Sequence, residues 1–219
     1  MDRLVELLPR LLTAAWETVY MVGIAMIIGG VLGLALGLGL YLTRAGSILQ
    51  NRALFAVLNV VVNVFRPIPF IILLAAVQPL GRLVIGTGIG NGMAIFGLVV
   101  GSMFAIARIV EQNLLTVQPG VIEAARAIGA SPLRIIATVL IPEALGPLIL
   151  GYTFIFIAVT DMSAVAGLIG GGGLGNFAIQ YGYRLFNWTV TWAAVLLIIV
   201  LVQFTQLVGN ALARRVLRR

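Results

Sequence analysis

The sequence predicts an all-α membrane protein with five transmembrane helices. Of its 219 residues, 61% are hydrophobic and only 10% are charged, which is far from the composition of a soluble domain. Its apolar segments are longer than the ~20 residues that cross a bilayer. A polar interruption separates two of them, at residues 116–138. We therefore expect one domain, residues 1–219, with spans at about 13–42, 53–78, 93–115, 139–162 and 188–212.

Several function classes are excluded by residues that the chain does not contain. There is no His and no Cys, which rules out imidazole catalysis, thiolate chemistry, disulfides and ordinary zinc or haem sites. No GxxxxGK[ST] motif is present, so the chain cannot bind ATP through a P-loop. The run 170–175 fits GxGxxG, but no strand precedes it and no acidic residue follows Asp161. We therefore predict no catalytic, cofactor or metal site in this chain, and any ATP hydrolysis must belong to another subunit.

The first apolar segment follows a short amphipathic helix expected at residues 1–12, whose five leucines are placed on one side. The segment is too long for a signal-peptide core, so we expect it to remain in the mature chain. Gly29, Gly33 and Gly37 recur at every fourth position and form a ridge of small residues. Such a ridge lets another helix approach closely, and we favour this packing role over a substrate path.

The second segment contains the sequence Phe65-Arg66-Pro67-Ile68-Pro69-Phe70. Two prolines two residues apart should kink or break the helix. Arg66 inside a span is costly unless it faces protein or water, so it is either a structural anchor or a pathway residue. Asn59 and Asn63 lie one turn apart and suggest a polar, inward-facing stripe. We expect residues 79–92 to form an external loop.

The polar interruption opens with a predicted short helix. Pro119 and Gly120 precede this helix and Gly129 stops it, after which Ser131 and Pro132 cap and open a second helix. Just before the interruption, Arg108 and Glu111 are spaced for a local ion pair. The short helix is therefore expected to project from the membrane between two spans.

The short helix carries Glu123, Ala124, Ala125 and Arg126. We expect the Glu123 carboxylate to complement the positive end of the helix dipole. Ala124 and Ala125 are expected to provide a flat surface for another subunit. Gly129 would let the backbone turn sharply after it.

The fourth span leads into a glycine-rich segment, Gly170–Gly175, which we predict to be irregular or re-entrant backbone. Asp161 is the only acidic residue in the apolar part of the last two spans. An acid at membrane depth is a candidate for substrate contact or for pairing with Arg66. The alternative places Asp161 at the outer mouth of its span, in contact with water.

The arginines predict the orientation of the chain. Trp188 and Trp192 open the last span and suggest the outer interface. Arg3, Arg10, Arg82 and Arg184 lie on one predicted side. Nine others lie on the opposite side, which the positive-inside rule makes cytoplasmic: 44, 52, 108, 126, 134, 214, 215, 218 and 219. The polar loop and the C-terminus are thus expected in the cytoplasm and the N-terminus outside.

The basic residues form no stripe on a soluble face, so we exclude nucleic-acid binding.

The polar loop resembles a known motif. Glu123-Ala124-Ala125, three residues, Gly129, nine residues and Val139–Pro142 resemble the EAA loop of bacterial ABC importer permeases. Further segments are similar to the methionine-importer branch of that family: residues 65–74, Pro142–Leu145, Gly172–Gly175 and Tyr181–Tyr183.

The resemblance implies a type I ABC importer permease fold with a cytoplasmic coupling helix, in the bacterial inner membrane. It also implies a homodimer, two ATPase subunits and a substrate-binding lipoprotein or periplasmic protein, besides membrane lipid. The residues expected to couple to the ATPase are Glu123, Ala124, Ala125, Arg126, Gly129, Ser131 and Pro132. The gate and pathway hypothesis comprises Asp161, Met162, Ser163, Val165, Gly167, Arg66 and Asn63.

The function implied is ATP-driven import of methionine, in the L form, the D form or both, by alternating access. No cofactor is implied for this chain. The alternatives are a permease for another amino acid, an ion-coupled secondary carrier and a purely structural membrane subunit.

Overall fold

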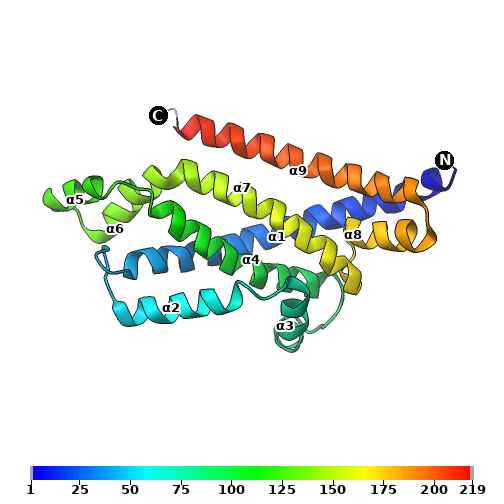
Figure 1. Ribbon diagram of the computed structural model, residues 1–219, viewed down its shortest axis with the longest axis horizontal. Helices are drawn as coiled ribbons and strands as arrows, with labels where there is room; N and C mark the ends of the chain where they lie inside the picture. Colours follow the sequence, from blue (N-terminus) through cyan, green and yellow to red (C-terminus); the bar gives the residue numbers. More distant parts are fainter. Residues whose placement is uncertain (1, 218–219) are drawn as a thin grey trace. The chain divides into compact units, whose positions relative to one another are not determined.

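The computed structural model describes residues 2–217, and over that range all regular secondary structure is helical, with no strand (Figure 1). The α-helices are α1 (Asp2–Thr43), α2 (Arg52–Phe65), α3 (Phe70–Ile85), α4 (Gly90–Leu114), α5 (Pro119–Ala127), α6 (Pro132–Ile135), α7 (Ile141–Ala166), α8 (Gly173–Phe177) and α9 (Trp188–Leu217). Three wide π-type segments, Ile136–Leu140, Gly167–Gly171 and Ala178–Gly182, and a 3-10 turn at Tyr183–Leu185 join some of them.

Four helical stretches of the described chain are long and apolar enough to cross a membrane: Leu4–Thr43, Gly90–Leu114, Pro132–Gly171 and Trp188–Leu217. The bent pair α2 and α3 makes a fifth when it is counted as one span. The predicted all-α membrane fold is confirmed.

The chain divides into two compact units. Unit 1 comprises Met1–Gly29, Ile68–Ser102 and Phe156–Gln206, and unit 2 comprises Gly30–Pro67, Met103–Ile155 and Leu207–Arg219.

The core of unit 1 joins the beginning of α1 to α8 and α9. Its buried members are Leu7, Leu11, Ala14, Leu174, Phe177, Val190 and Ala194. The separate helix expected at residues 1–12 is wrong, because α1 continues without interruption to Thr43. Leu8 and Leu12 are 47% and 59% exposed, so the five leucines do not share one face. Successive helical residues turn by about 100°, which puts Leu7 and Leu11 on the buried side and turns Leu8 and Leu12 away.

The glycine ridge of α1 packs against another helix, as predicted, and the structure identifies this helix as α4. In unit 2, a Cβ added at Gly33 would lie 2.6 Å from the Cβ of Ile106, and one at Gly37 would lie 2.6 Å from the Cβ of Val110. In unit 1, a Cβ at Gly29 would lie 3.1 Å from the carbonyl oxygen of Val99. The absence of side chains at these positions therefore allows two backbones to approach closely.

The double-proline segment breaks the helix, as predicted. α2 ends at Phe65, and α3 begins at Phe70 after Pro69. The external loop expected at 79–92 is wrong, because α3 continues to Ile85 with Pro79 inside it. Gly86 ends α3 in the left-handed conformation, with φ of 78°, so the connection to α4 shortens to residues 86–89.

The second helix predicted to open at Pro132 is continuous with the fourth apolar segment, so the span expected at 139–162 lies within one helical stretch, Pro132–Gly171. Wide turns at Ile136–Leu140 precede Pro142, which has no N–H to donate to the carbonyl four residues earlier. The glycine-rich segment is irregular, as predicted: φ is 93° at Gly170 and 74° at Gly172. Residues 173–185 return to helical turns that the sequence did not suggest.

Candidate functional site

The polar interruption folds into α5, a tight turn and α6, all within unit 2. The expectation that Pro119 and Gly120 precede the short helix is wrong, because α5 begins at Pro119. A proline is favoured in this first turn, where its missing N–H costs no hydrogen bond. At the other end, Gly129 has φ of 79°. Its N–H donates to Arg126 O at 2.9 Å, and the N–H of Ala130 donates to Ala125 O at 3.1 Å. These two bonds form a Schellman motif, so Gly129 stops the helix as predicted.

One face of α5 is buried and the other is exposed. Ile122 and Ala125 are each 8% exposed and face inward, whereas Glu123, Ala124 and Arg126 are exposed. The flat surface expected from two alanines therefore contains only Ala124. The capping role expected of Glu123 is also wrong, because α5 begins at Pro119 and its first turn holds no acidic residue.

Ser131 and Pro132 open α6, as predicted, although the serine hydroxyl makes no capping bond within the described residues. The backbone carbonyl of Ser131 accepts the N–H of Ile135 at 3.0 Å instead. Ile135 is 1% exposed and anchors α6 in unit 2. In Figure 1, α5 and α6 lie together where α4 ends and α7 begins.

Two large apolar side chains stand on either side of the Gly129 turn. Ile128 is 85% exposed and Leu133 is 78% exposed, although both belong to the polar interruption. We call the exposed residues Ala124, Ile128, Gly129, Ser131, Pro132 and Leu133 the turn surface. Sequence reasoning missed Ile128 and Leu133. They could have been found as apolar residues outside the helical stripe that contains Ile122 and Ala125.

A polar cluster connects α2 and α4 in unit 2. Arg108 forms the predicted ion pair with Glu111 at 2.5 Å, and its other terminal nitrogen donates to Asn59 Oδ1 at 3.0 Å and to Asn63 Oδ1. Asn63 in turn donates to Asn59 Oδ1 at 3.1 Å. The side chains of Arg108 and Glu111 are 16% and 4% exposed. Asn59 is partly buried but Asn63 is exposed, so the two asparagines form the predicted polar stripe, which faces Arg108, but the stripe is not buried inside the protein. The sequence did not identify Arg108 as their partner.

The chain matches known transport proteins over most of its length. The family model for the inner-membrane component of binding-protein-dependent transport systems matches residues 29–218. The chain belongs to this family. It is therefore a multi-pass inner-membrane component of a transport system.

Two curated relatives and one solved structure illustrate the similarity. The probable D-methionine transport system permease protein MetI of Vibrio cholerae is 44% identical over 206 residues, covering 94% of this chain and 92% of the relative. The methionine import system permease protein MetP of Bacillus subtilis is 42% identical, covering 97% and 96%. A chain of the inward-facing MetNI methionine ABC transporter is 42% identical, with a TM-score of 0.93, covering 96% of this chain and 98% of that one.

Among the gate candidates of this inner-membrane component, Asp161 is exposed and Met162 is partly buried in unit 1. Ser163 is 3% exposed, and its hydroxyl donates to Thr160 O at 2.7 Å, within its own helix. Val165 is partly buried. A Cβ at Gly167 would lie 2.7 Å from Gly172 O and from Asn176 N, so this glycine lets the end of α7 contact α8. Ser163 and Gly167 thus have structural roles in the described chain.

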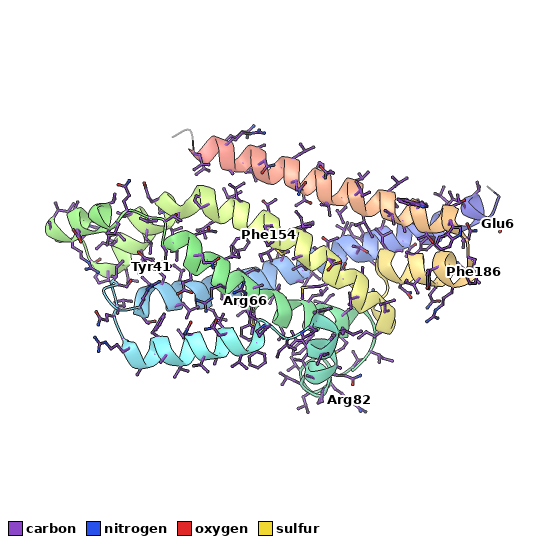
Figure 2. The ribbon with its side chains drawn as sticks, in the orientation of Figure 1. Glu6, Tyr41, Arg66, Arg82, Phe154 and Phe186 are labelled. Carbon is purple, nitrogen blue, oxygen red and sulfur yellow. The ribbon has the colours of Figure 1, made fainter. Side chains whose placement is uncertain are left out.

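Arg66 follows the last residue of α2, and its side chain is exposed (Figure 2). Its backbone N–H donates to Val62 O at 3.1 Å. No side-chain hydrogen bond of Arg66 occurs within residues 4–217. Asn63, the other pathway candidate of unit 2, is engaged by Arg108.

Sequence reasoning also missed two polar residues of α1 that hold the glycine-rich segment. Glu17 Oε2 accepts the N–H of Gly173 at 2.7 Å, and Thr18 Oγ1 accepts the N–H of Leu174 at 2.8 Å. These N–H groups open α8, where no partner exists within the helix. Glu17 and Gly173 are 156 residues apart, so spacing in the sequence carries no signal for the contact.

Proposed function

We propose that this chain is the membrane-spanning subunit of an ATP-driven importer of methionine. A separate ATPase subunit hydrolyses ATP, and alternating access of the permease moves the substrate inward. Relatives that cover more than nine tenths of the chain bear the names of methionine or D-methionine permeases. The solved structure with a TM-score of 0.93 is a methionine ABC transporter. The proposed cargo is the L form, the D form or both, and competition of each unlabelled stereoisomer with labelled methionine identifies which.

The observation that carries the coupling part of the proposal is the turn surface. Ile128 and Leu133, at 85% and 78% exposure, flank one tight turn, and large apolar side chains gathered on a surface in contact with water typically mark an interaction site. An exposed patch of this kind is typical of a docking site. We assign to it the ATPase subunit, because the spacing that defines the EAA resemblance centres on the same turn.

The proposed orientation places α5, α6 and the C-terminus in the cytoplasm and the N-terminus outside. The arginine distribution supports it. Arg218 and Arg219, which contribute to that count, lie outside the described residues, and Arg3 lies outside the side chains described. Because the natural chain has no cysteine, single cysteines at Ala127 and at Thr87 report sidedness directly.

In intact cells, a membrane-impermeant maleimide should label the cysteine at position 87 and leave the one at 127 unlabelled. In inverted vesicles the labelling should reverse. Labelling of position 127 from outside the cell would refute the orientation.

A second copy of the chain, two ATPase subunits and a substrate-delivering binding protein complete the proposed assembly. Reconstitution tests the function as a whole. Proteoliposomes with all subunits should take up labelled methionine only when ATP is supplied, and unlabelled methionine should compete better than other amino acids. Uptake that follows an ion gradient without ATP would establish a secondary carrier instead. Preferential competition by a different amino acid would reassign the cargo.

A further inference from the structure

A cleft in unit 2 lies between the loop after α1 and the first turns of α5. Its volume is about 320 Å³, within the ~300–1,000 Å³ range of ligand pockets. Its polar lining comprises Tyr41, Arg44, Ser47, Glu123 and Arg126. Tyr41, labelled in Figure 2, lies near the end of α1, so the cleft is at the end of a membrane-spanning helix.

The loop that forms one wall is held in a defined conformation. The N–H of Ser47 donates to Arg44 O at 3.1 Å, and the N–H of Leu49 donates to Leu42 O at 3.0 Å. The Gln50 side chain accepts the N–H of Gly46 at 3.0 Å. The wall is thus built before any ligand arrives, which reduces the entropy lost on binding.

The cleft has an excess of positive charge. Within the described side chains the one ion pair is Arg108 with Glu111, so neither Arg44 nor Arg126 has a carboxylate partner within 4.0 Å. Glu123 offsets one of the two arginine charges and leaves one positive charge in excess. Two guanidinium groups line this one cleft, and each presents several N–H donors of the kind that bind phosphate oxygens.

Ser47 provides an independent indication. Its hydroxyl oxygen is buried and, among the described residues, is the one buried side-chain N or O atom without a hydrogen-bond partner. Such an atom costs free energy unless something satisfies it. Ser47 lines the cleft, so its hydroxyl can turn and donate to an acceptor oxygen bound there.

We propose that this cleft binds a phosphate group, held by Arg44, Arg126 and the Ser47 hydroxyl. The group is either the phosphodiester of an anionic membrane lipid or a free phosphate. Basic pockets beside transmembrane helices on the cytoplasmic side commonly bind such headgroups. A bound phosphate would connect the loop after α1 with α5.

The test uses the full-length chain purified with the subunits that accompany it, and a binding readout that involves no transport. Phosphatidylglycerol, phosphatidylcholine and inorganic phosphate are titrated separately and detected by native mass spectrometry. The variants are Arg44→Gln and Ser47→Ala. Arg52→Gln is the matched control, since Arg52 is exposed at the start of α2 and does not line the cleft.

For a lipid phosphate, we expect tight binding of phosphatidylglycerol that Arg44→Gln and Ser47→Ala each weaken about tenfold, equivalent to ~1.4 kcal/mol. Arg52→Gln should leave it within about twofold, and phosphatidylcholine should bind weakly. For a free phosphate, inorganic phosphate should bind with the same sensitivity to the variants, and all forms should bind phosphatidylglycerol equally. If neither probe distinguishes the two variants from wild type, or if Arg52→Gln weakens binding as much, the proposal is overturned.

Folding of the variants is checked by thermal unfolding in detergent, in the absence of lipid and phosphate. Ser47→Ala removes a buried unpaired hydroxyl, so its melting temperature in lipid-free detergent should equal or exceed that of wild type. A lower melting temperature under these conditions would show that the hydroxyl has a partner within the protein, and it would also overturn the proposal.

Discussion

Arg108 on α4 donates to Asn59 on α2 at 3.0 Å, across 49 residues of sequence. The same guanidinium pairs with Glu111, whose side chain is 4% exposed. A charged group with so little access to water is tolerated because every neighbour in the cluster is a hydrogen-bond partner. The cluster therefore fixes the position of α2, the helix that leads into the double-proline break.

Removal of Arg108 should destabilise the protein strongly. Arg108→Leu leaves the buried Glu111 carboxylate unpaired, which costs about 3–5 kcal/mol. Arg108→Leu combined with Glu111→Leu removes both charges and should cost clearly less. Thermal unfolding of the detergent-purified variants measures the difference. Equal losses in the single and double variants would show that the ion pair is not the stabilising contact.

The glycine ridge should tolerate no side chain where α4 approaches. Gly33→Ala places a methyl group 2.6 Å from Ile106 Cβ and 2.8 Å from the Met103 carbonyl oxygen. Crowding of this kind costs about 1–3 kcal/mol. Gly23→Ala is the control, because a Cβ at Gly23 has no neighbour within 4 Å and a helical alanine is favoured over glycine by about 1 kcal/mol. The ridge has no packing role if both variants melt at the same temperature.

Glu17 should control the order of the segment that follows the glycine run. Glu17→Ala removes the acceptor for the N–H of Gly173, and a hydrogen bond to a charged group contributes about 1.5–3 kcal/mol. Hydrogen exchange of the first α8 amides should therefore accelerate by tenfold or more. Glu17→Gln keeps a carbonyl acceptor and should show a smaller change. Unchanged hydrogen exchange in Glu17→Ala would mean that local backbone contacts, and not the Glu17 carboxylate, order the start of α8.

The Gly129 turn should matter through its backbone alone. A Cβ at Gly129 meets nothing within 4 Å, but its φ of 79° disfavours any other L-residue. Gly129→Ala should destabilise the end of α5 by about 1 kcal/mol, and a β-branched residue such as valine should cost more. Gly120→Ala, within α5 and also without neighbours, should be neutral or slightly favourable.

Methionine uptake and ATPase binding are measured for Gly129→Val and Gly120→Ala. Gly129→Val should impair both while the protein remains in the membrane, and Gly120→Ala should retain both. Normal uptake by Gly129→Val would show that the sharp turn is not needed for coupling.

Features set by local chemistry could be predicted from the sequence. The break after Phe65, the helix end before Gly129 and the irregular glycine run each follow from proline or glycine geometry. The Arg108 and Glu111 pair follows from helical spacing. The locations of Ser131 and Pro132 at the start of α6 were also predictable, although the serine hydroxyl makes no cap within the described residues.

Features that depend on neighbouring segments could not be predicted. The glycine-rich run at 79–92 suggested a loop, but α3 continues through Pro79 to Ile85, as membrane helices often do when neighbours satisfy the freed carbonyl. The orientation of α5, which buries Ala125 and exposes Ile128, depends on which face meets the rest of unit 2. Contacts such as that between Glu17 and Gly173 join residues too distant in sequence for any spacing rule.

The most direct test of the account is ATP-driven uptake by proteoliposomes that contain the Ile128→Asp variant, its ATPase subunit and the binding protein. Ile128 is 85% exposed, so the substitution should not disturb folding of the permease. A charge placed in an apolar contact should weaken ATPase binding and reduce methionine uptake at least tenfold, while Ile128→Leu should retain both. Uptake by Ile128→Asp at the wild-type rate, with the ATPase bound normally, would contradict the claim that a separate motor drives this chain through the turn surface.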